Sequence, residues 1–253
     1  MQRLYLIHHM KRSGGHAVIH WLTKNLPGTV FVNNEIQAQP ILQGRSALPD
    51  GRLPYKDWVR RKERKFEYAD LLANAASVLV SLEDHELRVR PFFHTAIQTI
   101  VIVRSPQNLF ASRIKKSSNT SLLAYAIDNP ELLGRAVRIW KEHARAALGL
   151  VDAGMPVKPI FYDAWLTTDH YRSALALSLE FSAFSEPSGE LTTEGGGSSF
   201  GSERLDQAAL LRRVDLLSEP EKQILEQIMS DPEMIDLDTL MKARIAEISR
   251  ART

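Results

Sequence analysis

The fold is decided by the stretch LYLIHHMKRSGGHAVIHWL, residues 4–22. Its first four residues form a short apolar run, and residues 17–22 have the apolar spacing of a helix. Between them lies a polar segment that contains two glycines, Gly14 and Gly15. A loop between a strand and a helix points backbone N–H groups and the helix N-terminus at an anion, and small residues let a phosphate approach the backbone. The stretch therefore predicts a phosphate-binding loop.

The rest of the chain alternates between strand and helix patterns. Further strands are predicted at residues 29–32, 77–82, 99–103 and 157–162, and helices at 108–116, 130–151, 166–179 and from 206 onward. This alternation predicts an α/β fold with a central, mainly parallel sheet flanked by helices. We expect a single domain over residues 1–253, in which residues 36–75 form a lid or insertion and residues 203–253 a C-terminal helical segment.

Composition excludes several classes of protein. The chain has 253 residues, of which 44% are apolar and 25% charged, as is typical of a globular protein. It has no cysteine, which excludes disulfides, thiolate metal sites and cysteine nucleophiles. The net charge of +2 argues against nucleic-acid binding, and no apolar run reaches the roughly 20 residues of a membrane span. We expect a cytoplasmic protein without a nucleic-acid partner or stable membrane insertion; the sequence leaves its oligomeric state open.

The loop departs from the nucleotide-binding loop of kinases and NTPases. When Gly14 is placed at the last glycine of that motif, Gly15 and His16 stand where a lysine and a serine or threonine belong. The hydroxyl that would hold Mg²⁺ is therefore missing. We expect phosphate binding without a metal.

The same residues resemble the sulfotransferase superfamily. Its first loop typically reads Pro-Lys/Arg-Ser-Gly-Thr-Thr and binds the 5′-phosphosulfate of 3′-phosphoadenosine 5′-phosphosulfate (PAPS). Three residues match this pattern, whereas a lysine replaces the proline and Gly-His replaces the two threonines. The resemblance implies a P-loop-like sulfotransferase fold in which the donor's 5′ end is bound by Lys11, Arg12, Ser13, Gly14, Gly15 and His16.

A second motif, IVIVRSPQNLFAS at residues 100–112, strengthens the resemblance. In the family, an arginine ends a strand and a serine follows eight residues later, and together they bind the 3′-phosphate. Arg104 and Ser112 have this spacing. Arginine offers a planar fork to phosphate oxygens, and a serine hydroxyl adds a donor. A third segment, residues 160–165, is similar to a strand-ending Tyr-Glu-Asp-Leu stretch of the family, and we interpret it as structural.

Sulfuryl transfer to a hydroxyl needs a base to take the proton. Glu35 is the first candidate, because the resemblance places a glutamate just after the first helix in some members. Glu83, Asp84 and His85 follow the predicted strand at 77–82 and are the reserve candidates; His85 is similar to a histidine that cytosolic members use. Arg12 would stabilise charge on the bridging oxygen.

The resemblance implies a sulfotransferase that moves a sulfuryl group from PAPS to a hydroxyl, leaving adenosine 3′,5′-bisphosphate (PAP). The acceptor is unidentified, and the resemblance to the family favours a carbohydrate or glycolipid. A glycine-rich stretch at residues 195–201 falls where the family carries a glycine-containing loop near the 3′-phosphate, and its alternative is a flexible linker. The stretch lacks the basic residue of that loop unless Arg204 supplies it. The alternatives are a P-loop kinase or NTPase-like nucleotide-binding protein and a non-catalytic sulfotransferase-like binding protein. The histidines match no common zinc-ligand spacing.

Overall fold

The computed structural model describes residues 3–26, 28–32, 75–88, 97–118, 129–152, 156–181, 187 and 211–250. Within these residues five strands form one sheet: β1 (Arg3–His9), β2 (Thr29–Val32), β3 (Ser77–Glu83), β4 (Ile97–Val103) and β5 (Val157–Phe161). The strand order is β2-β3-β1-β4-β5, and every pairing is parallel. The predicted α/β fold with a parallel sheet is confirmed.

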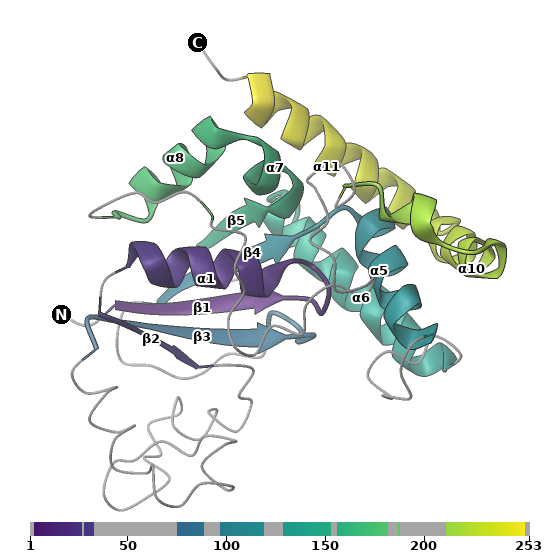
Figure 1. The fold of residues 1–253 in the computed structure, drawn as a ribbon, viewed down its shortest axis with the longest axis horizontal. Coiled ribbons are helices and arrows are strands. Elements are labelled where there is room, and N and C mark those ends of the chain that lie inside the picture. The colour runs from purple at the N-terminus through teal and green to yellow at the C-terminus, as the bar shows by residue number, and fades with distance from the viewer. Residues whose placement is uncertain are drawn as a thin grey trace, which may run out of the picture.

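The central strands are buried on both faces, which explains their continuous apolar sequences. Leu6 and Ile7 of β1 and Ile100 and Val101 of β4 have no exposed surface. Helix α1 (Gly15–Asn25) lies above β1 in the view of Figure 1 and contributes Val18 and other apolar side chains to the core. The first strand and helix are thus the centre of the fold.

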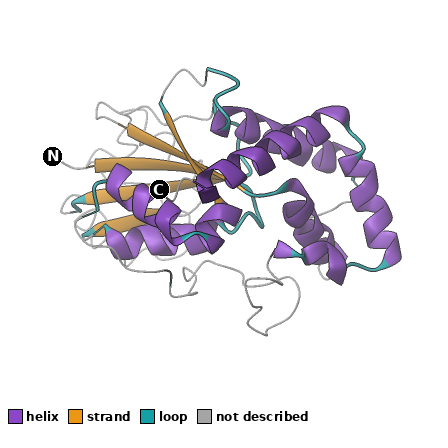
Figure 2. Ribbon diagram, turned by 90° about the horizontal axis from the view of Figure 1, so that it is seen from above, coloured by secondary structure: helices purple, strands orange, loops and turns teal. Residues whose placement is uncertain are grey.

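The other helices within the described ranges follow β4 in the chain. They are α5 (Pro106–Ser118), α6 (Pro130–Ala147), α7 (Tyr162–Thr167), α8 (Asp169–Ser178), the 3-10 helix η4 (Arg213–Leu216), α10 (Glu219–Met229) and α11 (Pro232–Arg250). Figure 2 shows a group of these helices extending to one side, past the ends of the strands. Helix α10 begins with a capping box in which Ser218 and Glu221 satisfy each other's backbone N–H groups.

Two boundaries differ from the sequence prediction. The predicted strand at 157–162 ends at Phe161, and the predicted helix at 166–179 is two helices, because Thr168 has an extended backbone between α7 and α8. The hydroxyl of Tyr171 on α8 accepts a hydrogen bond from the N–H of Phe161, at 3.1 Å. This contact ties α8 back to the sheet edge, and a break in the helix makes the contact possible.

The loops that follow β1, β3 and β4 lie together at the carboxyl ends of these parallel strands. β1 lies between β3 and β4, with His9 in register with Glu83 on one side and Ile102 on the other. Ligands of open α/β sheets bind at such a point, outside the carboxyl ends of the strands. In Figure 1 the strands point toward α5 and α6, so the loops after β1, β3 and β4 face these helices.

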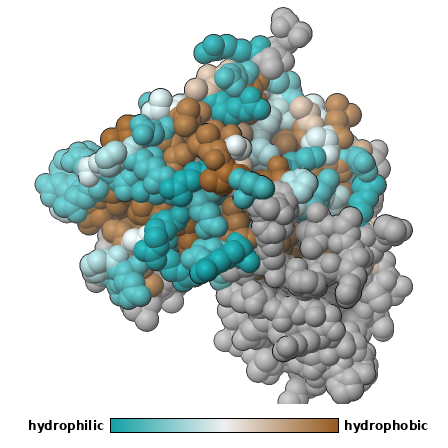
Figure 3. Space-filling view, turned by 180° about the vertical axis from the view of Figure 1, so that it is seen from behind, coloured by the Kyte–Doolittle hydropathy of each residue, from teal (hydrophilic) through white to brown (hydrophobic). Residues whose placement is uncertain are grey.

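The surface mixes polar and apolar residues. Figure 3 shows both kinds on the face opposite to the view of Figure 1. Among the described residues, the exposed large apolar side chains come from the segment after α6, from α8, from η4 and from α11: Leu150, Val151, Leu177, Leu216, Ile235 and Leu240. Among the described helices, none is both long enough and apolar enough to cross a bilayer.

Candidate functional site

The β1–α1 loop (Met10–Gly14) reverses the chain between the central strand and the first helix. The N–H of Ser13 donates to the carbonyl oxygen of Met10 at 3.1 Å, and the N–H groups of Ala17 and Val18 donate to that of Gly14. Arg12 and Gly14 both have a left-handed backbone, with φ of 72° and 83°. A left-handed arginine is uncommon, because its Cβ is crowded in this region. The loop is therefore a tight turn held in an unusual conformation.

Close contacts explain both glycines of the loop motif. A Cβ added to Gly14 would clash with the ring of Tyr162, and one added to Gly15 would clash with the imidazole of His9. In the family pattern a threonine stands at position 15. Here the ring of His9 fills the adjacent space, so a glycine is needed. The glycine at position 15 is thus explained by the ring of His9.

Arg12, Arg104 and Ser112, predicted from separate motifs, meet beside this loop. The Nη1 of Arg104 donates to the carbonyl oxygen of Arg12 at 3.1 Å, and the Nε of Arg12 donates to the Oγ of Ser112 at 3.2 Å. Arg104 follows β4 and Ser112 lies on α5, and both are nearly fully buried. The indole N–H of Trp140 donates to the carbonyl oxygen of Arg104 at 3.0 Å. Three segments of the chain thus bring two guanidinium groups and a hydroxyl together.

Tyr162 and Asp163 support this cluster, because Tyr162 contacts Arg104 and Asp163 contacts the next residue, Ser105. The guanidinium carbon of Arg104 lies 5.0 Å from the centre of the Tyr162 ring, a cation–π contact. The N–H of Ser105 donates to Oδ2 of Asp163 at 2.8 Å. Burial raises the pKa of Asp163, and the nearby charge of Arg104 opposes this rise. The segment we interpreted as structural therefore supports the backbone and side chain at Arg104.

Arg213 joins the cluster and was not predicted from the sequence. It begins η4, is 5% exposed, and its N–H donates to Oδ1 of Asn108 on α5 at 3.0 Å. Burial and the charges of Arg104 and Arg12 lower the pKa of Arg213 to about 10. We call Arg12, Arg104 and Arg213 the arginine cluster. Three guanidinium groups held this close favour an anion with several oxygens.

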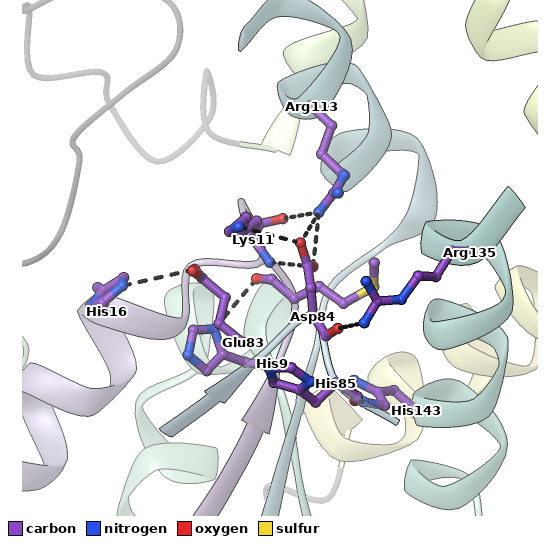
Figure 4. A network of polar contacts seen from close by, with 10 residues as sticks. His9, Lys11, His16, Glu83, Asp84, His85, Arg113, Arg135 and His143 are labelled. Carbon is purple, nitrogen blue, oxygen red and sulfur yellow. Dashed lines mark hydrogen bonds and ion pairs between the residues drawn. The ribbon is translucent and has the colours of Figure 1, made fainter. Parts of the chain in front are cut away.

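The other side of the β1–α1 loop carries acidic residues and histidines, as Figure 4 shows. Glu83 ends β3, and its Oε1 lies 3.9 Å from Nε2 of His16 at the start of α1. Burial raises the pKa of Glu83, and the charge of Asp84 adds to the rise. Glu83 is therefore a partly buried carboxyl group next to the loop, with acidic and basic neighbours.

His85 lies in a group of buried histidines. Nε2 of His143 donates to the carbonyl oxygen of His85 at 2.8 Å, and the rings of His8 and His143 are in edge contact at 5.9 Å. Burial lowers the pKa of His9 and of His143 to about 4, and that of His8 well below its usual value. In Figure 4, Arg113 and Lys11 lie on one side of Asp84, and His85 and His143 on the other.

Comparisons with known proteins bear on this arrangement. No family model matches the chain, and a comparison with curated proteins finds no similar sequence. Among solved structures, the mouse sulfotransferase SULT7A1, complexed with PAP, is similar with a TM-score of 0.50 and 12% identity, over 95% of this chain and 88% of that chain. The chain has the sulfotransferase fold. This confirms the predicted fold family.

Two further structures are similar at lower TM-scores. One is the sulfotransferase domain from the curacin biosynthetic pathway, at 0.46 and 15% identity, which covers 91% of this chain and 97% of that chain. The other is the sulfotransferase domain from the Synechococcus PCC 7002 olefin synthase, at 0.44 and 14% identity, which covers 96% of this chain and 94% of that chain.

Several predictions concern residues outside the described ranges. Glu35, the first candidate for the base, is one of them, as are the glycine-rich stretch at 195–201, Arg204, and residues 36–74 of the lid or insertion. Within the sulfotransferase fold, the described candidates for the base are Glu83, Asp84 and His85. Of these, Glu83 lies beside His16 of the predicted donor-binding segment.

Proposed function

We propose that this protein is a sulfotransferase that uses PAPS and transfers its sulfuryl group to a hydroxyl of an acceptor. The observation that carries the proposal is the meeting of Arg12, Arg104 and Ser112, with Arg213 as a third guanidinium group. These residues would hold the 3′-phosphate and the bridging region of the donor. The resemblance predicted the first three, and the sulfotransferase fold is consistent with them.

The described residues fit a phosphorylated nucleotide. Arginine forks bind phosphate oxygens with two parallel hydrogen bonds, and a buried site strengthens them. The hydroxyl of Ser13 inside the loop is fully buried and donates to none of the described residues, so it has a hydrogen available for a ligand oxygen. The backbone of residues 11–16 would hold the 5′-phosphosulfate at the start of α1.

The reaction follows from these positions. The acceptor oxygen attacks sulfur while the bond from sulfur to the bridging oxygen breaks, and PAP leaves with the bonding electrons. Arg12 would stabilise the charge that develops on the bridging oxygen, an electrostatic role. The acceptor's proton passes to a carboxylate. For the acceptor we propose a carbohydrate or glycolipid hydroxyl.

Glu35 remains our first proposal for the base, and the position of Glu83 supports a second. Glu83 is partly buried at the carboxyl end of β3 beside His16, and burial raises its pKa, which makes its carboxylate a stronger base. Replacement of the true base by glutamine should lower turnover by about 100-fold or more while PAP affinity changes little. Single-turnover rates of Glu35→Gln and Glu83→Gln decide between them. Equal, wild-type rates in both variants would move the base to His85.

Two measurements test the proposed function. Calorimetry with PAP in the presence of EDTA should show binding, since no step proposed here uses a divalent cation. Incubation with ³⁵S-labelled PAPS and a panel of glycans and glycolipids should label at least one acceptor. Binding of ATP with Mg²⁺ in place of PAP would favour a kinase or NTPase, and PAP binding without transfer to any acceptor would favour a non-catalytic binding protein.

A further inference from the structure

Asp84 reaches across from the end of β3 to the β1–α1 loop. Its Oδ1 accepts a hydrogen bond from the backbone N–H of Lys11 at 3.0 Å, and its own N–H donates to the carbonyl oxygen of His9 at 2.9 Å. Asp84 has a left-handed backbone with φ of 59°. Such strained residues persist where several contacts fix them, and they are concentrated at functional sites.

Arg113 on α5 completes this contact. Its Nη1 donates to Oδ1 and Oδ2 of Asp84 at 2.9 and 3.1 Å, and to the carbonyl oxygen of Lys11 at 3.4 Å. The side chains of Asp84 and Arg113 are 17% and 8% exposed. Burial disfavours the charged carboxyl, but Arg113 outweighs it and the pKa of Asp84 is lowered. Both backbone polar groups of Lys11 are thus held by one buried ion pair, drawn in Figure 4.

The ion pair and the arginine cluster hold neighbouring residues of the same loop. Arg104 donates to the carbonyl oxygen of Arg12, while Asp84 and Arg113 hold the N–H and the carbonyl oxygen of Lys11. The consecutive residues Ser112 and Arg113 of α5 contact Arg12 and Lys11 respectively. Side chains therefore hold the backbone N–H and carbonyl oxygen of Lys11 and the carbonyl oxygen of Arg12.

The rest of the arginine cluster is supported independently of this ion pair. The carbonyl oxygen of Arg104 is held by Trp140, its guanidinium lies on Tyr162, and the N–H of Arg213 is held by Asn108. Loss of the ion pair would therefore disturb Lys11 and Arg12 more than it disturbs Arg104 and Arg213. A residue that only stabilised the fold would weaken both parts of the site alike.

We infer that Asp84 and Arg113 are positioning residues that set the backbone of Lys11 and Arg12 for the 5′-phosphosulfate end of the donor without touching it. The inference rests on the proposed function, because it assumes that this loop binds the 5′ end. Removal of the ion pair should therefore weaken the binding of 5′-phosphorylated ligands, whereas the binding of 3′-phosphorylated ligands should stay nearly unchanged.

The test compares three ligands by calorimetry: PAP, adenosine 5′-monophosphate and adenosine 3′-monophosphate. Asp84→Asn keeps the side-chain size but removes the charge that Arg113 faces. In this variant the affinity for the 5′-monophosphate should fall about tenfold or more, while that for the 3′-monophosphate stays within about twofold. Arg113→Lys keeps the charge but has a shorter side chain that does not reach the carbonyl oxygen of Lys11, and it should show a smaller loss with the same selectivity.

A double variant and a matched control sharpen the test. Arg113→Met removes the closer of the two cations that face Asp84 and leaves only the ammonium of Lys11, at 4.0 Å. The Asp84→Asn/Arg113→Met double variant should therefore bind the 5′-monophosphate better than Arg113→Met alone. Lys115→Met removes another ion pair of α5, that with Glu221 at 3.2 Å, and should leave all three affinities unchanged. Circular dichroism confirms that each variant is folded.

The possible results distinguish a failure of this inference from a failure of the proposed function. A selective loss of 5′-monophosphate binding in Asp84→Asn and Arg113→Lys supports the inference. Equal losses for both monophosphates, or no loss in either folded variant, overturn it while the proposed function stands. A wild-type protein that binds none of the three ligands overturns the proposed function and this inference with it.

Discussion

The two sides of the β1–α1 loop are built differently. On one side, Arg104 of the arginine cluster lies over the ring of Tyr162, and burial together with the charges of Arg104 and Arg12 lowers the pKa of Arg213. On the other side, the charge of Asp84 is matched by Arg113, and burial lowers the pKa of His9 and His143. Like charges held together indicate a place for an anion, whereas matched charges and neutral rings indicate support for the loop.

The buried histidines His9 and His143 should cause most of the loss of folding stability in acid. His9 and His143 have pKa values lowered to about 4, so below about pH 6.5 the unfolded chain binds more protons than the folded one. Stability should be fully present at neutral pH and fall between about pH 6.5 and 4, by up to about 3 kcal/mol for each of these histidines. The raised pKa of Glu83 opposes this loss in part.

Thermal unfolding measured from pH 7.5 to 4.5 checks this prediction. His143→Gln keeps a donor for the carbonyl oxygen of His85 and removes the titrating ring, so its midpoint should fall less with acid than that of the wild type. His20→Gln, which changes a partly exposed histidine of α1, should follow the wild type. A wild-type midpoint that does not change over this range would contradict the histidine account.

On the arginine side, Arg104 should have the largest effect on ligand binding. Arg104→Ala removes a guanidinium group from the phosphate site and also the donor that holds the carbonyl oxygen of Arg12. The affinity for PAP should fall about 100-fold or more, since hydrogen bonds to charged groups are lost at two points. Calorimetry measures the loss, and thermal unfolding at pH 7.5 confirms that the variant is folded. An unchanged affinity would exclude Arg104 from the site.

Replacement of Arg213 should have a smaller effect on PAP affinity, and the neighbouring residue Arg212 provides a matched control. Arg213→Ala should weaken PAP binding about tenfold, because one of three guanidinium groups is lost. Arg212 is the preceding residue, and its side chain is 73% exposed and paired with Asp215. Arg212→Ala should therefore keep the wild-type affinity. Equal losses in the two variants would indicate a general charge effect and would contradict a specific role for Arg213.

The residues that could be predicted from the sequence are those that lie next to each strand end. The apolar runs of β1 and β4 each lead into a polar segment and then a helix, so the β1–α1 loop was visible as a local pattern. Arg104 and Ser112 were predicted from the resemblance of the second motif to the family. Arg213 and the ion pair of Asp84 with Arg113 were not, because their partners are far away in the chain: Asn108 is 105 residues from Arg213, and Lys11 is 73 residues from Asp84. No periodicity encodes such contacts.

The division of residues 162–178 into α7 and α8 was missed for a similar reason. The apolar spacing continues through this region, whereas the break at Thr168 goes with the contact of Tyr171 with the backbone of Phe161 in β5. Tertiary contacts of this kind override local propensity.

The central claim is that the arginine cluster and the β1–α1 loop hold the two ends of one nucleotide. A crystal structure with PAP bound tests it most directly. One phosphate should lie within hydrogen-bond distance of Arg104, Arg213 and Ser112, and the other should lie against the backbone of residues 11–16, next to Arg12. A nucleotide bound elsewhere, or one whose 3′-phosphate has no contact with Arg104 or Arg213, would contradict it.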